Sequence, residues 1–273
     1  MSTAANAVAT RAGQRQARIV SQAEWLEARK ALLAKEKEWT HLKDALSAER
    51  QQLPWVRVEK NYLFETASGK RTLSDLFEGR SQLIIYHFMF GPEWAEGCPG
   101  CSIVGDHLDG SVAHVNARDI TLMAVSRAPL GKIQAFQKRM GWRFPWASSF
   151  GSDFNFDYNV SFTPEQVANG KAEYNYGQQP FPTDEAPGAS VFYKHTDGTI
   201  YHTYSSYGRG LEQVMGVYNW IDIAPKGRNE AGLTPPMAWV RHHDKYGDPN
   251  AASKIAAPTI EAKKGSCCSE QKS

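Results

Sequence analysis

The stretch that decides the fold begins Leu83-Ile84-Ile85-Tyr86-His87-Phe88-Met89-Phe90 and continues, beyond Gly91-Pro92, to Glu96-Gly97-Cys98-Pro99-Gly100-Cys101-Ser102. Its first part is apolar apart from His87, which is typical of a central strand that is covered on both faces. Residues 101–116 can form a helix, so the two cysteines lie at a strand-to-helix junction. A C-x-x-C pair within a β-α-β pattern predicts a thioredoxin-like redox unit.

The spacing of the two cysteines suits thiol–disulfide chemistry. Cys98 falls at the expected N-terminus of the helix, where the aligned backbone amides stabilise a thiolate. Cys101 lies one turn further along, close enough to form a disulfide with Cys98. Pro99 fits the first helical turn because it lacks an amide hydrogen that would have no partner there. We therefore predict that Cys98 is the exposed nucleophile and Cys101 the resolving thiol.

The sequence around this motif alternates strands and helices, which predicts an α/β three-layer sandwich over residues 54–248. We expect further strands at Trp55–Val58, Asp119–Val125, Ser190–Tyr193 and Thr199–Tyr204, and helices at Leu130–Met140 and Leu211–Ile221. Residues 142–188 are rich in aromatic side chains and read as an insertion. Three interpretations of this insertion stay open: a hydrophobic pocket or lid over the cysteines, a packing subdomain, or the surface of a homodimer.

The N-terminal part of the chain predicts a helical extension over residues 21–53. Ser21 and Glu24 form a capping box, and Pro54 ends the run. Apolar residues recur there every seven positions, at Trp25, Leu32, Trp39, Leu46 and Leu53. Because the companion positions Ala28, Lys35 and Glu49 are poor core residues, we expect the helix to pack on its own domain rather than in a coiled-coil dimer. Residues 1–20 read as a disordered leader, and residues 249–273 as a disordered tail that carries Cys267 and Cys268.

Composition narrows the classes of function. The chain has 273 residues, of which 31 are basic and 29 acidic, so its net charge of +2 gives no field to attract nucleic acid or an anionic membrane. The longest apolar run is far shorter than the roughly 20 residues that cross a bilayer. Four cysteines are too few for a disulfide framework, and no apolar export signal opens the chain. We therefore expect a cytoplasmic protein.

From Ser21 to Asp244 the sequence resembles the bacterial thioredoxin-like proteins of domain-of-unknown-function family 899. The resemblance rests on residues 53–60, 86–91, 97–102, 144–146 and 150–155, which read LPWVRVEK, YHFMFG, GCPGCS, FPW and FGSDFN. It implies a thioredoxin-like fold and supplies no substrate. The sequence departs from two better-known relatives. Thioredoxins carry Trp-Cys-Gly-Pro-Cys, and the T-x-x-C motif of peroxiredoxins would require threonine at the position of Ala95.

Three further residues are candidates for substrate binding. Trp94 lies four residues before Cys98. Arg127 follows a buried strand and could stabilise the Cys98 thiolate or bind an acidic substrate, the alternative being a solvated loop arginine. Pro187 precedes the strand Ser190–Tyr193, where thioredoxin-like proteins place a cis-proline, the alternative being an ordinary turn proline. Glu96 could relay a proton beside Cys98, or be a solvated loop acid.

The histidines give weaker indications. We expect His87 to be a neutral core residue and His107 to face solvent, while His202 is a weak candidate metal ligand. The resulting prediction is a thiol–disulfide oxidoreductase without cofactor or resident metal. It would exchange electrons with a cellular thiol reductant or a disulfide-containing substrate. The alternatives are a metal-binding or metal-transfer protein that uses Cys98, Cys101 and His202 or the tail cysteines, and a non-enzymatic interaction module.

Overall fold

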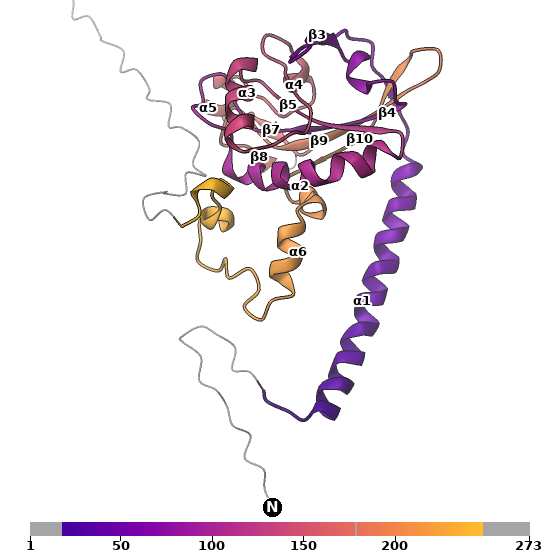
Figure 1. Cartoon of the computed structure of the whole chain (residues 1–273), viewed down its shortest axis with the longest axis vertical. Helices are drawn as coiled ribbons and strands as arrows, with labels where there is room; N and C mark the ends of the chain where they lie inside the picture. Colours follow the sequence, from indigo (N-terminus) through magenta and orange to yellow (C-terminus); the bar gives the residue numbers. More distant parts are fainter. Residues whose placement is uncertain (1–17, 178, 248–273) are drawn as a thin grey trace, which may run out of the picture.

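The computed structural model describes residues 18–177 and 179–247 (Figure 1). The leader expected over residues 1–20 lies mostly outside these ranges, and the tail with Cys267 and Cys268 lies entirely outside them. The helices are α1 (Gln22–Gln51), α2 (Pro99–Asn116), α3 (Leu130–Arg139), α4 (Phe154–Asp157), α5 (Pro164–Ala168) and α6 (Gly216–Asp222). The strands are β1 (Val56–Arg57), β2 (Leu63–Thr66), β3 (Gly69–Thr72), β4 (Gln82–His87), β5 (Ile120–Ser126), β6 (Trp146–Ser148), β7 (Glu173–Tyr174), β8 (Gln179–Pro180), β9 (Gly188–Lys194) and β10 (Ile200–Tyr207). Short 3-10 helices are η1 (Asp75–Phe77), η2 (Gly208–Val214), η3 (Pro236–Trp239) and η4 (His243–Lys245).

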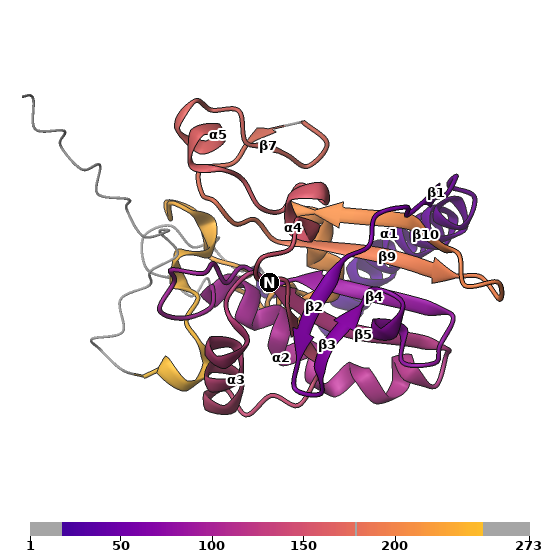
Figure 2. The same cartoon turned by 90° about the horizontal axis from the view of Figure 1, so that it is seen from above.

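A single eight-stranded sheet organises the domain, with the strand order β1-β10-β9-β4-β5-β6-β2-β3. The apolar strand β4 lies at its centre, parallel to β5 and antiparallel to β9. Figure 2 shows these strands edge to edge, with helices and loops above and below them. The arrangement is the thioredoxin-like α/β fold that the sequence predicts, with the C-x-x-C pair at the start of the helix that follows the central strand.

Alternation along β4 separates two cores, because successive side chains of a strand point to opposite faces. On one face, Tyr86 belongs to a core built with α2, α3, α6 and the aromatic residues 142–146, which we call the α2-side core. On the other, Leu83 and Ile85 belong to a core built with η1, α4 and residues 160–174, which we call the α4-side core. Both faces of β4 are covered, which explains why this strand is almost continuously apolar.

The aromatic segment 142–188 belongs to the domain's packing. Trp142, Phe144 and Trp146 are buried in the α2-side core, and Phe154 and Tyr158 in the α4-side core. Strand β6 from this segment joins the sheet beside β5. Most aromatic rings of this segment are buried in the two cores. Of the three interpretations, the structure therefore supports the one in which the segment is part of the domain's packing.

Helix α1 is formed as predicted, with both hydrogen bonds of the capping box between Ser21 and Glu24. Its environment differs from the expectation. No residue of α1 is buried, and the helix leaves the domain as a rod that touches it only near its C-terminal end (Figure 1). The prediction that α1 packs on its own domain is therefore wrong. No helix in the described ranges is long and apolar enough to cross a membrane.

The helix expected at Leu211–Ile221 is broken in two. Residues Gly208–Val214 form η2 and Gly216–Asp222 form α6, with Met215 between them in a non-helical conformation. Gly216 at the break lies against His107 of α2, where a side chain of its own would crowd the imidazole ring. Helix α2 thus comes close to the chain at the point where η2 ends and α6 begins. The spacing of apolar residues in the sequence did not indicate this break.

Candidate functional site

The two cysteines sit where the chain passes from β4 into α2. Cys98 is the N-cap residue of α2, Pro99 occupies the first helical position, and Cys101 lies one turn inside. The Met89 backbone holds both: its carbonyl accepts the Cys98 N–H at 3.0 Å, and its N–H donates to the Cys101 sulfur at 3.4 Å. Cys98 is partly exposed, whereas Cys101 is buried, and both are free thiols. The order of exposure is the one required of a nucleophile and a resolving thiol.

The two thiols have opposite pKa shifts. A hydrogen bond from Cys101 holds the pKa of Cys98 below its ordinary value, and the backbone N–H groups of Gly100 and Cys101 act in the same direction against the effect of burial. Burial raises the pKa of Cys101 well above its ordinary value, and the neighbouring Cys98 sulfur adds to this. Hydrogen bonds from Cys101 and from the first turn of α2 therefore favour charge on Cys98, whereas burial disfavours it on Cys101.

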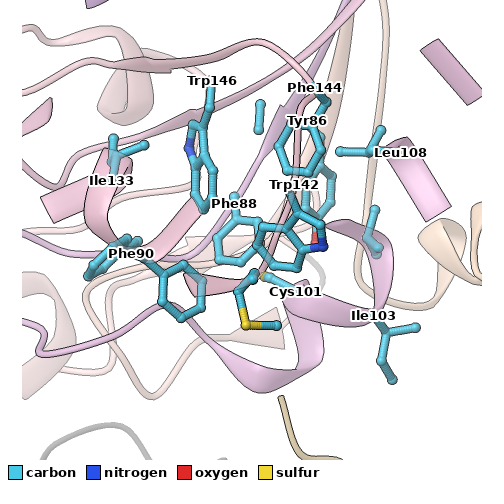
Figure 3. Packing of buried hydrophobic residues seen from close by; sticks show 14 of the residues in the cluster. Tyr86, Phe88, Phe90, Cys101, Ile103, Leu108, Ile133, Trp142, Phe144 and Trp146 are labelled. Atoms are coloured by element: carbon cyan, nitrogen blue, oxygen red, sulfur yellow. The ribbon is translucent and has the colours of Figure 1, made fainter. Parts of the chain in front are cut away.

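Tyr86 is a site residue that the sequence analysis missed. Its side chain lies on the same face of β4 as Cys101, and its hydroxyl lowers the pKa of that thiol in opposition to burial. Figure 3 shows Tyr86 and Cys101 in the α2-side core, together with Phe88 and Trp142. Apart from this interaction with Cys101, no hydrogen-bond partner of the buried hydroxyl is found among the described residues. A donor that lies next to a buried sulfur and has no competing partner is well placed to stabilise a thiolate there.

The C-terminal segment covers the start of α2. Met237 and Cys98 both lie next to Gly100. A Cβ atom placed on Gly100 would be 3.6 Å from the Met237 methyl group and 3.6 Å from the Cys98 sulfur. The buried His242 hydrogen-bonds the Gly97 carbonyl through Nε2 at 2.7 Å, so Nε2 carries the proton. Arg139 can only donate, so Nδ1 of His242 accepts from its guanidinium at 3.0 Å, as in a neutral imidazole. Burial lowers the pKa of His242, which acts in the same direction. This segment fixes the loop that precedes Cys98.

Glu96 takes part in the same attachment. Its carboxylate pairs with Arg139 at 2.9 Å and with Lys245 at 2.7 Å. Although burial opposes it, these two cations lower the pKa of Glu96. A carboxylate held ionised by two cations is a poor proton relay, and it is not a solvated loop acid either. Glu96 instead ties the approach to Cys98 to helix α3 and the C-terminal segment.

The candidate substrate-binding residues Trp94 and Arg127 have other partners. Trp94 is buried in the α2-side core and packs against Gly91. Arg127 pairs with the buried Glu185 at 2.9 Å, and its guanidinium lies 4.4 Å from the centre of the Phe156 ring. Burial raises the pKa of Glu185 to about 8, although Arg127 opposes the shift. No hydrogen bond or ion pair joins Arg127 to a cysteine within residues 18–177 and 179–247.

Pro187 stands directly before β9, which begins at Gly188 rather than at Ser190. Gly188 pairs with His87 at the end of β4 that leads to the cysteines. Along the described chain the cis peptide bonds are confined to Thr234–Pro235, so the bond to Pro187 is trans. The expectation of a cis-proline at this position is therefore wrong, although the position next to the strand is the expected one.

Of the three histidines considered above, His87 is buried, and His107 and His202 are half-buried. His87 is buried, bonds Ser190 at 2.8 Å and has a pKa that burial lowers to about 3, so the prediction of a neutral core histidine is confirmed. His107 does not face solvent: it bonds the Ile103 carbonyl and accepts the Val217 N–H at 3.1 Å, which joins α2 to α6. His202 packs on Tyr158 of the α4-side core, across the sheet from Cys101. It is therefore not brought to the cysteines as a metal ligand.

The tail cysteines that the metal-binding alternative also invoked lie outside the described residues. Within the two described ranges, no three His, Cys, Asp or Glu side chains converge as a metal site would require.

A twisted α/β sheet with a C-x-x-C pair at the N-terminus of the helix after its central strand defines a thioredoxin-like protein. The chain belongs to the family described as bacterial protein of unknown function, DUF899, whose family model matches residues 14–246. The resemblance drawn from the sequence motifs is thereby confirmed.

Comparison with other known proteins adds these findings. No curated protein matches the chain. Solved structures similar to it include a cysteine-to-serine mutant of PrxQ from Xylella fastidiosa, with 14% identity and a TM-score of 0.40 over 61% of this chain and 94% of that one. Peroxidoxin BcpB from Mycobacterium tuberculosis has 13% identity and a TM-score of 0.36 over 62% and 97% of the two chains. The mitochondrial 2-cys peroxiredoxin from Plasmodium falciparum has 10% identity and a TM-score of 0.36 over 62% and 92%.

Proposed function

We propose that this protein is a thiol–disulfide oxidoreductase in which Cys98 attacks and Cys101 resolves. The observation that carries the proposal is the asymmetry of the pair: Cys98 is a partly exposed residue with a lowered thiol pKa, and it lies next to the buried Cys101, whose thiol pKa is raised. An attacking cysteine must be ionised and open to the substrate disulfide. A resolving cysteine must lie next to it and remain protonated, so that it does not react with other thiols or disulfides. Met89 holds both cysteines in place for this sequence of events.

The first step is attack by the Cys98 thiolate on one sulfur of a substrate disulfide. A bond forms between Cys98 and that sulfur, the substrate disulfide breaks, and the other sulfur leaves as a thiolate that takes a proton from water. Cys101 then loses its proton and attacks the Cys98 sulfur, which expels the second substrate thiolate. The substrate gains two electrons and two protons, and the protein is left with a Cys98–Cys101 disulfide.

A cellular dithiol or low-molecular-mass thiol closes the cycle. Its thiolate attacks the Cys98 sulfur, so Cys101 is the leaving group and departs as a thiolate in a buried setting. The second thiol of the dithiol, or a second thiol molecule, then attacks the mixed disulfide, becomes part of the oxidised reductant and releases Cys98. Burial makes the charge on Cys101 costly, and the Tyr86 hydroxyl beside Cys101 is the donor that can stabilise it. Tyr86 thus acts on the step in which the pair is reduced.

Counting released thiolates under single-turnover conditions tests this proposal. The reduced protein, with Cys267→Ser and Cys268→Ser as background, is mixed with dithiobis(nitrobenzoic acid), whose thiolate absorbs visible light. The unsubstituted pair should release two thiolates per chain and end as an intramolecular disulfide. The Cys101→Ser variant should release one and keep a mixed disulfide on Cys98, which mass spectrometry identifies.

The Cys98→Ser variant supplies the decisive comparison, because it retains the buried thiol only. It should release no thiolate on the time scale of the first reaction. Fast release from Cys98→Ser, or release of two thiolates without a Cys98–Cys101 disulfide, would show that the proposed order of attack is wrong. Circular dichroism of each variant checks that the fold is retained.

A further inference from the structure

Helix α1 carries a stripe of large apolar side chains that nothing in the described chain covers. Trp25, Trp39 and Leu42 are 51%, 63% and 59% exposed, and Leu32 and Leu46 are also exposed. The helix has 30 residues and no buried one, and Figure 1 shows it extending away from the sheet. Scattered single apolar residues on a surface need no explanation, but a continuous stripe along an isolated helix marks an interaction surface.

The stripe has the period and the size of a helix–helix interface. A seven-residue repeat on a helix of 3.6 residues per turn drifts by about 20° per repeat, which a left-handed supercoil with another helix follows. The large apolar side chains of α1 expose on the order of 700 Å² per chain, judged from their exposed fractions and ordinary side-chain areas. A stable interface needs about 800 Å² from each partner.

The remaining parts of the chain cannot supply this cover. Residues 1–17 contain no Leu, Ile, Phe, Tyr or Trp, and residues 248–273 contain Ile255 and Ile260 as their only members of that set. Neither segment has enough apolar surface to bury two tryptophans and five leucines.

We infer that α1 pairs with the α1 of a second copy of this chain, in antiparallel orientation. A two-fold axis between Trp39 and Leu42 sets Trp39 against the partner's Leu42 at the centre. Lys35 and Glu49 decide the orientation of the two helices. Each lies three residues after an apolar residue of the repeat, Leu32 and Leu46, and therefore on the face that meets the partner. In a parallel pair Lys35 would lie against the partner's Lys35 and Glu49 against the partner's Glu49, so like charges would meet. The antiparallel pair brings Lys35 within about one helical turn of the partner's Glu49, where opposite charges attract.

The same register accounts for the ends of the interface. It carries Trp25 and Leu26 past the partner's Gln51, where the partner's α1 ends, toward the partner's Trp55 and Val56, which are both exposed where the outer strand β1 begins. Trp55 already lies 5.1 Å from the Tyr193 ring, ring centre to ring centre, and so presents a fixed apolar surface. Leu26, which lies one position off the seven-residue stripe, thereby also finds an apolar partner.

Light scattering of the full-length protein after size exclusion tests the association. The protein should have a mass of about 61 kDa, twice the 30.4 kDa of one chain, at micromolar concentration. The double variant Trp39→Glu with Leu42→Glu should weaken dimerisation at least 100-fold. Ala34→Glu with Ala48→Glu adds the same charge on the opposite face of α1 and should leave the dimer intact. A monomeric unsubstituted protein, or equal effects of the two double variants, would overturn the inference.

Cysteine cross-linking tests the orientation in a background where the four native cysteines are replaced by serine. Lys35→Cys and Glu49→Cys proteins should form a disulfide with each other when mixed, while Lys35→Cys alone should not cross-link to itself. Self-cross-linking of Lys35→Cys would overturn the antiparallel arrangement. Thiolate release by the Cys98–Cys101 pair, measured separately with native cysteines, should be unchanged in the Trp39→Glu with Leu42→Glu variant. The dimer and the proposed redox function therefore fail or stand independently.

Discussion

Substituting Glu185 by glutamine should change how the stability of the protein depends on pH. The Glu185 side chain is 1% exposed, pairs with Arg127 at 2.9 Å and accepts a hydrogen bond from Ser161 at 2.7 Å. Burial raises its pKa from 4.5 to about 8. In the folded protein it therefore stays protonated up to about pH 8, while in the unfolded chain it ionises near pH 4.5.

The sign and size of the effect follow from this difference in proton binding. Between pH 4.5 and 8 the folded state holds a proton that the unfolded state has lost, so stability falls as pH rises through this range. A difference of about 3.5 pH units, at about 1.36 kcal/mol per unit, corresponds to a loss on the order of 5 kcal/mol. The Glu185→Gln variant cannot ionise, so its free energy of unfolding relative to the unsubstituted protein should rise by several kcal/mol from pH 5 to pH 9.

Urea unfolding of both proteins at pH 5, 6, 7, 8 and 9 measures this difference directly. Glu59→Gln is the matched control, since it removes a carboxylate from an exposed position and reports the general effect of that change. A difference between Glu185→Gln and the unsubstituted protein that stays constant within about 1 kcal/mol across this range would refute the reasoning. A confirmed rise would also mean that below about pH 8 the charge of Arg127 is not neutralised by its partner.

Two further substitutions test the neighbourhood of the cysteines. A methyl group in Gly97→Ala would lie 2.6 Å from the Phe88 ring, so thermal unfolding should show a loss of about 1–3 kcal/mol, whereas Gly110→Ala in the open interior of α2 should be neutral or stabilising by up to about 1 kcal/mol. Equal stability of the two variants would contradict this account of the packing. Tyr86→Phe should keep or slightly raise stability, because within the described part of the chain the buried hydroxyl it removes has only its weak interaction with Cys101, while reduction of the Cys98–Cys101 disulfide should slow roughly 10- to 100-fold. An unchanged reduction rate, followed by alkylation and mass spectrometry, would remove Tyr86 from the mechanism.

The elements around the motif could be predicted because their signals are local. The apolar run that begins at Leu83 predicts a strand, and the structure has β4 there. The cysteine pair predicts the start of a helix, and α2 begins at Pro99, directly after Cys98. The Asp119–Val125 strand and the Leu130–Met140 helix shifted by one residue at their ends. Strand β9 begins two residues earlier than expected because Gly188 and Ala189 continue the ladder with β4. Glycine is a weak sign of a strand, so the sequence pattern did not include them.

The surroundings of the cysteines could be predicted only in part, because they are made by contacts over long sequence distances. His242 reaches Gly97 across 145 residues, and Arg127 meets Glu185 across 58. No motif or residue spacing in the sequence predicts either contact. Tyr86 is different: strand alternation places it on the same side of β4 as Phe88, facing the helix that carries Cys101. That periodicity was a usable signal for a polar group beside the resolving thiol.

Helix α1 shows why a pattern can be right about an element and still not settle its environment. The seven-residue repeat requires that Trp25, Trp39 and their neighbours be covered, because exposed apolar area of this extent is costly in water. The repeat does not say which surface covers them, and the charged residues Lys35 and Glu49 at interface positions argue against a partner helix. Their charges are opposite, however, so they oppose only a parallel pair. In an antiparallel pair the same two residues attract across the interface and select its register, in the way that charged positions specify orientation in coiled coils. Residues that are poor for burial in one chain are thus informative about how two chains meet.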